Sequence, residues 1–148
     1  MSLATFGQES AGFKVDVDGL KDLSTALLGL FNGASALLVG QNVEVRRVSD
    51  DGSSSNPIVA DRVKLKMSRF TAKVKAKVEA NTFTVDTTAI GLFKDNGISE
   101  IKVDASQAKF DGVSNVNGLN SADSVSLSGL LFKQPGAPLL VARKVRKR

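Results

Sequence analysis

The side chains that most often carry out catalysis are nearly absent from this chain. Its 148 residues include no histidine and no cysteine, which removes the commonest general base and the thiol nucleophile. The only adjacent carboxylate pair, Asp50 and Asp51, lies in a loop rich in serine and glycine. Acids in such loops are usually solvated turn residues. We therefore predict no catalytic residues and no enzyme activity, and an enzyme that uses carboxylates alone is the least favoured alternative.

A second group of acids has part of the spacing of a calcium loop. Asp16, Asp18 and Asp22 surround Gly19, but the third close ligand and the closing glutamate of an EF-hand are missing. We interpret the segment as the end of a strand followed by a helix cap. Zinc is not expected without histidine or cysteine. The sequence thus predicts no metal and no cofactor.

Lysines that alternate with apolar residues form the best candidate for a binding face. The outward-facing positions of the expected strands carry Lys64, Lys66, Lys73, Lys75 and Lys77. On adjacent strands these lysines would form a basic patch able to follow a nucleic-acid backbone. However, the chain has eight Phe and no Trp or Tyr, so rings for base stacking or sugar binding are scarce. We favour a solvated face over a nucleic-acid site.

The net charge of +5 comes from the last six residues, which carry five cations, while the rest of the chain is neutral. These cations are Arg143, Lys144, Arg146, Lys147 and Arg148. Runs of one charge usually remain in water, which predicts a basic terminal tail. The alternative is a contact with phosphate or another anionic surface.

The elements that must position these side chains are mainly strands, which period-2 alternation predicts. Expected strands include 13–17, 43–46 with a bulge after Arg46-Arg47, 63–67, 74–78, 83–85 and 101–103. Ala80-Asn81 is expected as a turn, and 105–112 as a turn-rich link. The exception is 20–31, where apolar residues recur at helical spacing. We predict a short helix there, capped by Asp22 or Ser24 and ended by Asn32-Gly33.

A repeated hairpin organises the chain. Val43 and Val63 are separated by 20 positions, as are Val125 and Val145, and both intervening loops contain glycine and proline. Two copies of one hairpin explain this better than chance similarity between amphipathic hairpins. We predict an all-β fold of two tandem OB-like Greek-key barrel units, or one sandwich built from both. The units are 1–67, which is divergent and contains the helix, and 68–148, which ends in the basic tail.

The second unit resembles a known family through its strand and turn pattern. The matching segments are Phe70 to Glu79, Thr82 to Val85, Val103 to Ser106, Phe110 to Gly112, Ser124 to Gly129 and Leu140 to Val145. This pattern is similar to that of a bacterial domain family of unknown function found in exported and cell-envelope proteins. The resemblance implies an OB-like barrel, and Gly40 to Lys66 looks like the end of a preceding copy. It implies no catalytic residues.

Together these observations predict a non-enzymatic binding or scaffolding domain of the cell envelope or secreted space. Its partner is an unidentified macromolecule, and we favour a protein over a nucleic acid. No signal peptide and no apolar run long enough to span a membrane are visible. The alternative is an OB-like nucleic-acid-binding module that uses the lysine-rich face.

Overall fold

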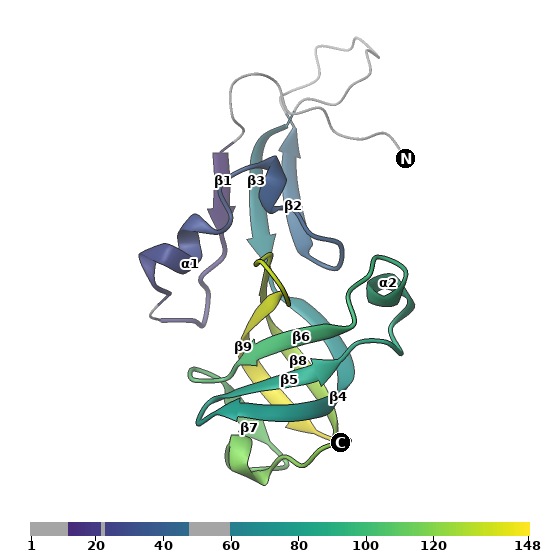
Figure 1. The fold of residues 1–148 in the computed structure, drawn as a ribbon. Coiled ribbons are helices and arrows are strands. Elements are labelled where there is room, and N and C mark those ends of the chain that lie inside the picture. Colours follow the sequence, from purple (N-terminus) through teal and green to yellow (C-terminus); the bar gives the residue numbers. More distant parts are fainter. Residues whose placement is uncertain (1–11, 22, 48–59) are drawn as a thin grey trace.

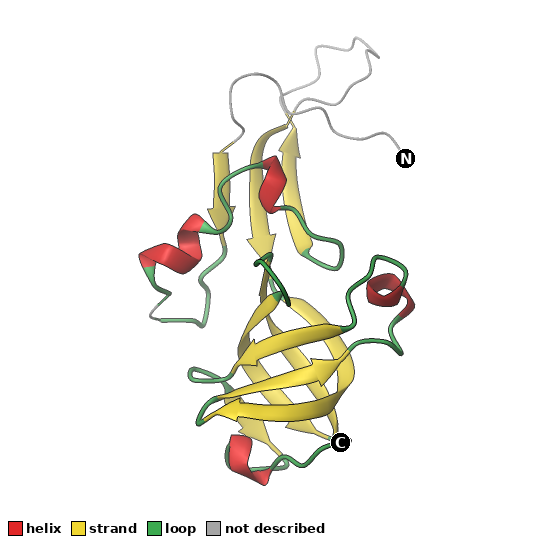
Figure 2. Ribbon diagram, viewed as in Figure 1, coloured by secondary structure: helices red, strands yellow, loops and turns green. Residues whose placement is uncertain are grey.

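A computed structural model describes residues 12–21, 23–47 and 60–148, and it consists mainly of strands (Figures 1 and 2). The strands form a three-stranded sheet and a six-stranded sheet that closes into a barrel. The prediction of an all-β, OB-like fold is confirmed. Asp50 and Asp51, with the other residues of 48–59, and Asp22 lie outside the described residues. None of the helices in the described part is long and apolar enough to cross a membrane.

The described residues of the first unit form the three-stranded sheet. It contains β1 (Gly12–Val15), β2 (Asn42–Arg47) and β3 (Ala60–Lys66), with β3 in the centre. β2 runs antiparallel to β3, and β1 runs parallel to it. The predicted helix is confirmed as the shorter α1 (Thr25–Gly29), in which Ser24 Oγ accepts a hydrogen bond from Leu27 N at 3.2 Å. A 3-10 turn, Ala34–Ala36, leads to β2.

The second unit forms a closed barrel of five strands. These are β4 (Ser68–Glu79), β5 (Thr82–Asp86), β6 (Glu100–Asp104), β8 (Ser124–Phe132) and β9 (Leu139–Lys147). β4 pairs with both β5 and β8, and the parallel pair β6–β9 closes the barrel. This is a Greek-key order of the OB type. β7 (Lys109–Asp111) extends the sheet beyond β9, while α2 (Gly91–Lys94) and the 3-10 turn Val116–Gly118 lie in the connections.

The two units meet along continuous strands. Only Met67 separates β3 from β4, so one extended segment enters both sheets (Figure 1). The far end of the β8–β9 hairpin reaches the small sheet, and its Phe132 is fully buried with Phe31 and Leu65. A second core of apolar side chains fills the barrel. Since the hairpin supplies both cores, the position of the small sheet relative to the barrel is set by packing.

The two predicted hairpins are present and share one register. Val45 pairs with Val63 in the first, and Leu127 pairs with Val145 in the second. Each partner in the second hairpin lies 82 positions after its equivalent in the first. A register shift also falls at equivalent places, between Arg46 and Arg47 and between Ser128 and Gly129. The bulge predicted after Arg46-Arg47 lies between these two residues, with the extra residue, Asp61, on β3, and an equivalent bulge occurs in the second copy.

Three sequence-based predictions differ from the structure. The link 105–112 contains β7, which pairs in parallel with β9. In strand 74–78, only Val74 of the side chains expected to face inward is buried. A register shift follows Val74, and Val78 is 51% exposed. The cations expected in a terminal tail begin inside β9, which pairs with β8 on one side and with β6 and β7 on the other. Backbone pairing therefore holds four of those five cations in fixed rows.

Candidate functional site

The structure separates the five lysines of the predicted binding face. Lys64 and Lys66 lie on the small sheet, where each is only partly exposed. Lys64 Nζ lies 3.5 Å from an Asp16 carboxylate oxygen, and Lys66 Nζ lies 3.4 Å from Glu44. Each of these two lysines thus has a carboxylate beside it that compensates its charge.

The other three lysines lie along β4 of the barrel. Lys75 makes an ion pair with Glu100 on β6, and the hydrogen bond to that carboxylate raises the pKa of Lys75. Lys77 donates a hydrogen bond to the backbone oxygen of Asn117 at 2.8 Å. Lys73 is exposed and pairs in register with Ser124 of β8. Of the predicted face, only Lys73 adjoins the larger basic surface described next.

The outer face of β4, β8, β9 and β7 carries rows of basic and hydroxyl side chains. Strand register sets these rows, because side chains at paired positions point to the same side of a sheet. The first row joins Arg69, Ser128, Lys144 and Lys109, and the second joins Thr71, Ser126, Arg146 and Asp111. Ser128 thus lies between two cations, whereas Ser126 lies between Thr71 and Arg146.

This arrangement forms a hollow of about 690 Å³, which we call the basic groove. Six cations line it, namely Arg69, Lys109, Arg143, Lys144, Arg146 and Arg148, and no acid is among its lining residues. Neighbouring strands lie about 4.8 Å apart. The backbone positions that carry the cations on β4 and β9 are therefore about 10 Å apart, and the serines of β8 lie between them. A groove of that width fits one chain of linked anions.

The charge of the basic groove is only slightly compensated. Asp111 lies 3.4 Å from Arg146 Nε and 3.9 Å from Lys144 Nζ, and one carboxylate thus serves two cations. Arg69 and Arg143 make no ion pair with the described residues. Beside the groove, hydrogen bonds from Lys147 and from the Asn120 backbone lower the pKa of Asp123, which keeps that carboxylate ionised. The six cations of the groove therefore outnumber the one carboxylate, Asp111, by five.

The hydroxyl groups at the bottom of the groove, which we call its floor, are held in place by hydrogen bonds to neighbouring side chains. The Thr71 and Ser126 hydroxyls lie 3.0 Å apart, and Arg148 Nε donates to Ser126 Oγ at 2.6 Å. Hydroxyls can both donate and accept hydrogen bonds, so they suit oxyanions placed between the cations. The floor and both walls come from paired strands, which positions these groups without a conformational change.

The aromatic side chains near the groove belong to the core. Phe70 is partly buried and stacks edge-on against Phe93, with 5.3 Å between the ring centroids. The large exposed hydrophobic residues of the described part are aliphatic. Phe70 lines the groove, but its packing against Phe93 leaves it only partly exposed, so charges and hydroxyls dominate the groove surface.

The described residues contain no group of three or more acids, histidines and cysteines placed to hold a metal ion. Asp16 and Asp18 of the calcium-like segment line a different hollow, where the small sheet meets the barrel. Sequence reasoning missed the basic groove because its rows depend on pairing between distant strands. Its signals were the alternating runs Arg69-x-Thr71-x-Lys73, Ser124-x-Ser126-x-Ser128 and Lys144-x-Arg146-x-Arg148.

The fold and the basic groove together define a small OB-like barrel protein with a cationic outer face. No model of a known protein family matches the chain, and no curated protein matches it by sequence.

Proposed function

We propose that this protein is a non-enzymatic module that binds single-stranded nucleic acid through its sugar–phosphate backbone. The observation that carries this proposal is the basic groove, in which six cations flank a serine floor without an acid in the lining. Phosphate contacts supply most of the sequence-independent affinity of nucleic-acid-binding proteins. The sequence alone favoured a protein partner, but the charge and width of the groove favour a phosphodiester chain.

The single-stranded form follows from the shape of the groove. Cations separated by about two strand spacings, roughly 10 Å, can contact both sides of one phosphodiester chain. A duplex would rest on the rims and reach the serine floor with only one of its strands. Because the ring of Phe70 in the groove lining is partly buried against Phe93, we expect little preference among bases and a strong dependence on salt.

The test is a fluorescence-anisotropy titration with labelled single-stranded DNA and RNA across a salt series. The test variant is Lys144→Gln/Arg146→Gln, which removes two groove cations from exposed positions on β9. If both contact phosphates, the slope of log affinity against log salt becomes less steep by roughly 1.4. We expect the affinity at low salt to fall at least tenfold, about 1.4 kcal/mol.

The matched control is Lys14→Gln/Lys94→Gln, which removes the same charge from two exposed positions outside the groove. Equal losses for the two double variants would mean that net charge, not the groove, drives binding. A sulfated polysaccharide that competes as well as nucleic acid would replace our proposal with a general polyanion site.

The cell-envelope or secreted setting implied by the family resemblance stays a prediction, as does the lack of enzyme activity. Fractionation of cells that produce the full-length protein would test the setting directly. Neither prediction affects the titration above, because the groove lies entirely within the described residues.

A further inference from the structure

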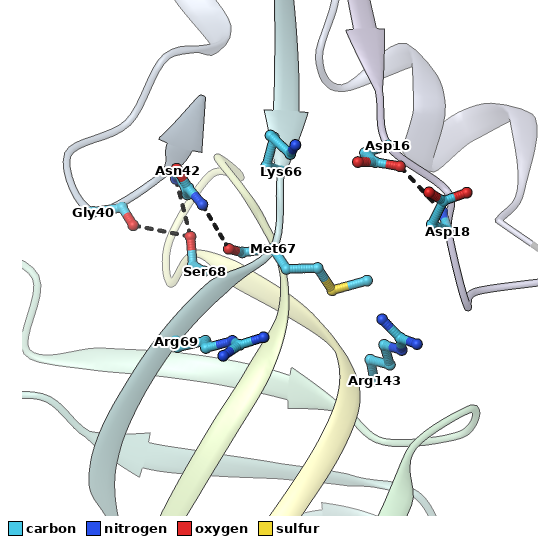
Figure 3. Close-up of a pocket in the computed structure, with 9 residues that line it drawn as sticks. All are labelled: Asp16, Asp18, Gly40, Asn42, Lys66, Met67, Ser68, Arg69 and Arg143. Carbon is cyan, nitrogen blue, oxygen red and sulfur yellow. Dashed lines mark hydrogen bonds between the residues drawn. The ribbon is translucent and has the colours of Figure 1, made fainter. Parts of the chain in front are cut away.

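The basic groove opens at one end onto a second hollow of about 700 Å³, which we call the junction pocket (Figure 3). It lies where the small sheet meets the barrel, and Arg69 and Arg143 line both hollows. In Figure 3, Asp16 and Asp18 of the segment after β1 lie on the far side of the pocket from Arg69, and Lys66 and Arg143 complete its charged lining. The junction pocket therefore differs from the basic groove in having two carboxylates among its lining residues.

A bulge places Arg143 at this boundary. The register shift in the β8–β9 hairpin leaves Arg143 without a direct partner on β8, and bulges commonly redirect a side chain in this way. The guanidinium lies against Gly19, whose φ is +82°, and a Cβ there would come within 2.5 Å of Arg143 Nε. The equivalent bulge residue of the first hairpin is Asp61, and Arg46 binds it at 2.7 Å. Arg143 has no such ion pair with the described residues.

The acidic side offers acceptors for hydroxyl groups. The Asp18 carboxylate makes no hydrogen bond or ion pair with the described residues, while Asp16 accepts a bond from Asp18 N at 3.3 Å and lies near Lys64. The opposite wall is held in place, because Ser68 Oγ donates to Gly40 O at 3.0 Å and accepts from Asn42 N at 3.1 Å. A phosphate that advanced past the arginines would meet the two carboxylates and be repelled.

We propose that the junction pocket holds the hydroxyl-bearing terminal sugar of a bound strand. The last phosphate lies on Arg69 and Arg143, and the terminal hydroxyls donate hydrogen bonds to Asp18 and Asp16. This inference rests on the proposed function, since it assumes that the strand occupies the basic groove. It adds a preference for a free strand end, which the groove alone would not produce. The calcium-like acidic segment of the sequence thereby acquires a role that needs no metal.

The test uses labelled hexanucleotides of one sequence in four forms, with a hydroxyl or a phosphate at the 3′ end and at the 5′ end. For one of the two ends, the wild-type protein should bind the hydroxyl form about tenfold more tightly, as expected for one charge-assisted hydrogen bond. Asp18→Asn should remove most of this preference by weakening the hydroxyl form and tightening the phosphate form. A closed circular strand of the same sequence should bind no better than the phosphate form.

The matched control is Asp95→Asn, which removes one exposed acid at the end of α2. It should leave the end preference unchanged. Equal binding of hydroxyl, phosphate and circular forms would overturn the end-binding inference and leave the proposed function standing. Failure of every form to bind at low salt would instead overturn the proposed function.

Discussion

The molecule contains the same three-stranded arrangement twice, and the two copies differ in what surrounds them. β1–β3–β2 in the small sheet corresponds to β7–β9–β8 in the barrel sheet. In each copy, a third strand pairs in parallel with the second strand of an antiparallel hairpin. This pairing places Phe13 opposite Val63 in the first copy and Phe110 opposite Val145 in the second. The local pattern therefore produced the same pairing and the same bulge in both copies.

The difference lies in the strands that follow. In the second copy, β4, β5 and β6 connect β8 to β9 around a closed path, while in the described part the first copy remains three strands wide. The tip of the β8–β9 hairpin, together with Phe31 from the helical connection, covers the inner face of the small sheet. Hairpin register is thus a local property, whereas closure depends on neighbours supplied by the rest of the chain.

Charge pairing differs between the copies as well. In the first copy, Arg46 and Lys66 each have a carboxylate of their own, Asp61 and Glu44. In the second copy Lys144 and Arg146 share Asp111. Because exposed ion pairs add little stability, this contrast bears on ligand binding more than on folding. It agrees with the binding role that we propose for the barrel face.

The largest expected effect comes from breaking the bulge in the second copy. Gly129 is buried, and an added Cβ would lie 2.2 Å from Val141 O. Gly129→Ala should therefore shift backbone pairing and lower the free energy of unfolding by about 3 kcal/mol in a urea titration. At the equivalent position of the first copy, the exposed Arg47→Ala should cost less than about 1 kcal/mol. Similar losses at both positions would contradict the view that the second bulge is the tighter one.

A smaller effect is expected from the acid shared by Lys144 and Arg146. Asp111→Asn should free two cations and tighten binding of single-stranded DNA about two- to fivefold, the range of an exposed ion pair. Glu44→Gln makes the same change in net charge on the small sheet and should leave the affinity unchanged. Anisotropy at fixed salt measures both. If the two variants tighten binding equally, the groove holds no special position in the electrostatics of the protein.

The smallest expected effect concerns acid stability. Hydrogen bonds from Lys147 and Asn120 lower the pKa of Asp123 in the second copy, and Arg46 lowers that of Asp61 in the first. A carboxyl with a lowered folded pKa stabilises the fold above its unfolded pKa, about 3.9, and this contribution disappears as the pH falls through the folded pKa. The urea midpoint should drop between pH 5 and pH 2, and Asp123→Asn should make that drop shallower. An unchanged pH profile in this variant would show that other carboxyls control acid unfolding.

Local features were predictable from the sequence because they depend on nearby residues. Capping preferences predict the helix cap at Ser24. Alternation and turn residues predict both hairpins, the turn at Ala80-Asn81 and an irregularity near Arg46-Arg47. β7 escaped prediction, since a three-residue strand carries little periodicity and exists through its parallel pairing with β9. The lysine face was assembled from two strands that belong to different sheets. The groove was missed for the converse reason, because its cations come from β4, β7 and β9, which only the folded sheet brings together around β8.

β9 also has a consequence for how the chain folds. Its Leu139 and Val141 enter the core beneath the small sheet, while Leu140, Ala142 and Val145 enter the core of the barrel. Neither core is complete before β9 has paired, and the β6–β9 contact joins segments nearly forty residues apart, as in Lys102 with Leu139. Folding is therefore expected to be slow, as for other chains dominated by long-range strand pairs. A nascent chain that has emerged only as far as β8 would expose apolar faces and unpaired strand edges. Such surfaces promote aggregation, so we expect this intermediate to bind molecular chaperones.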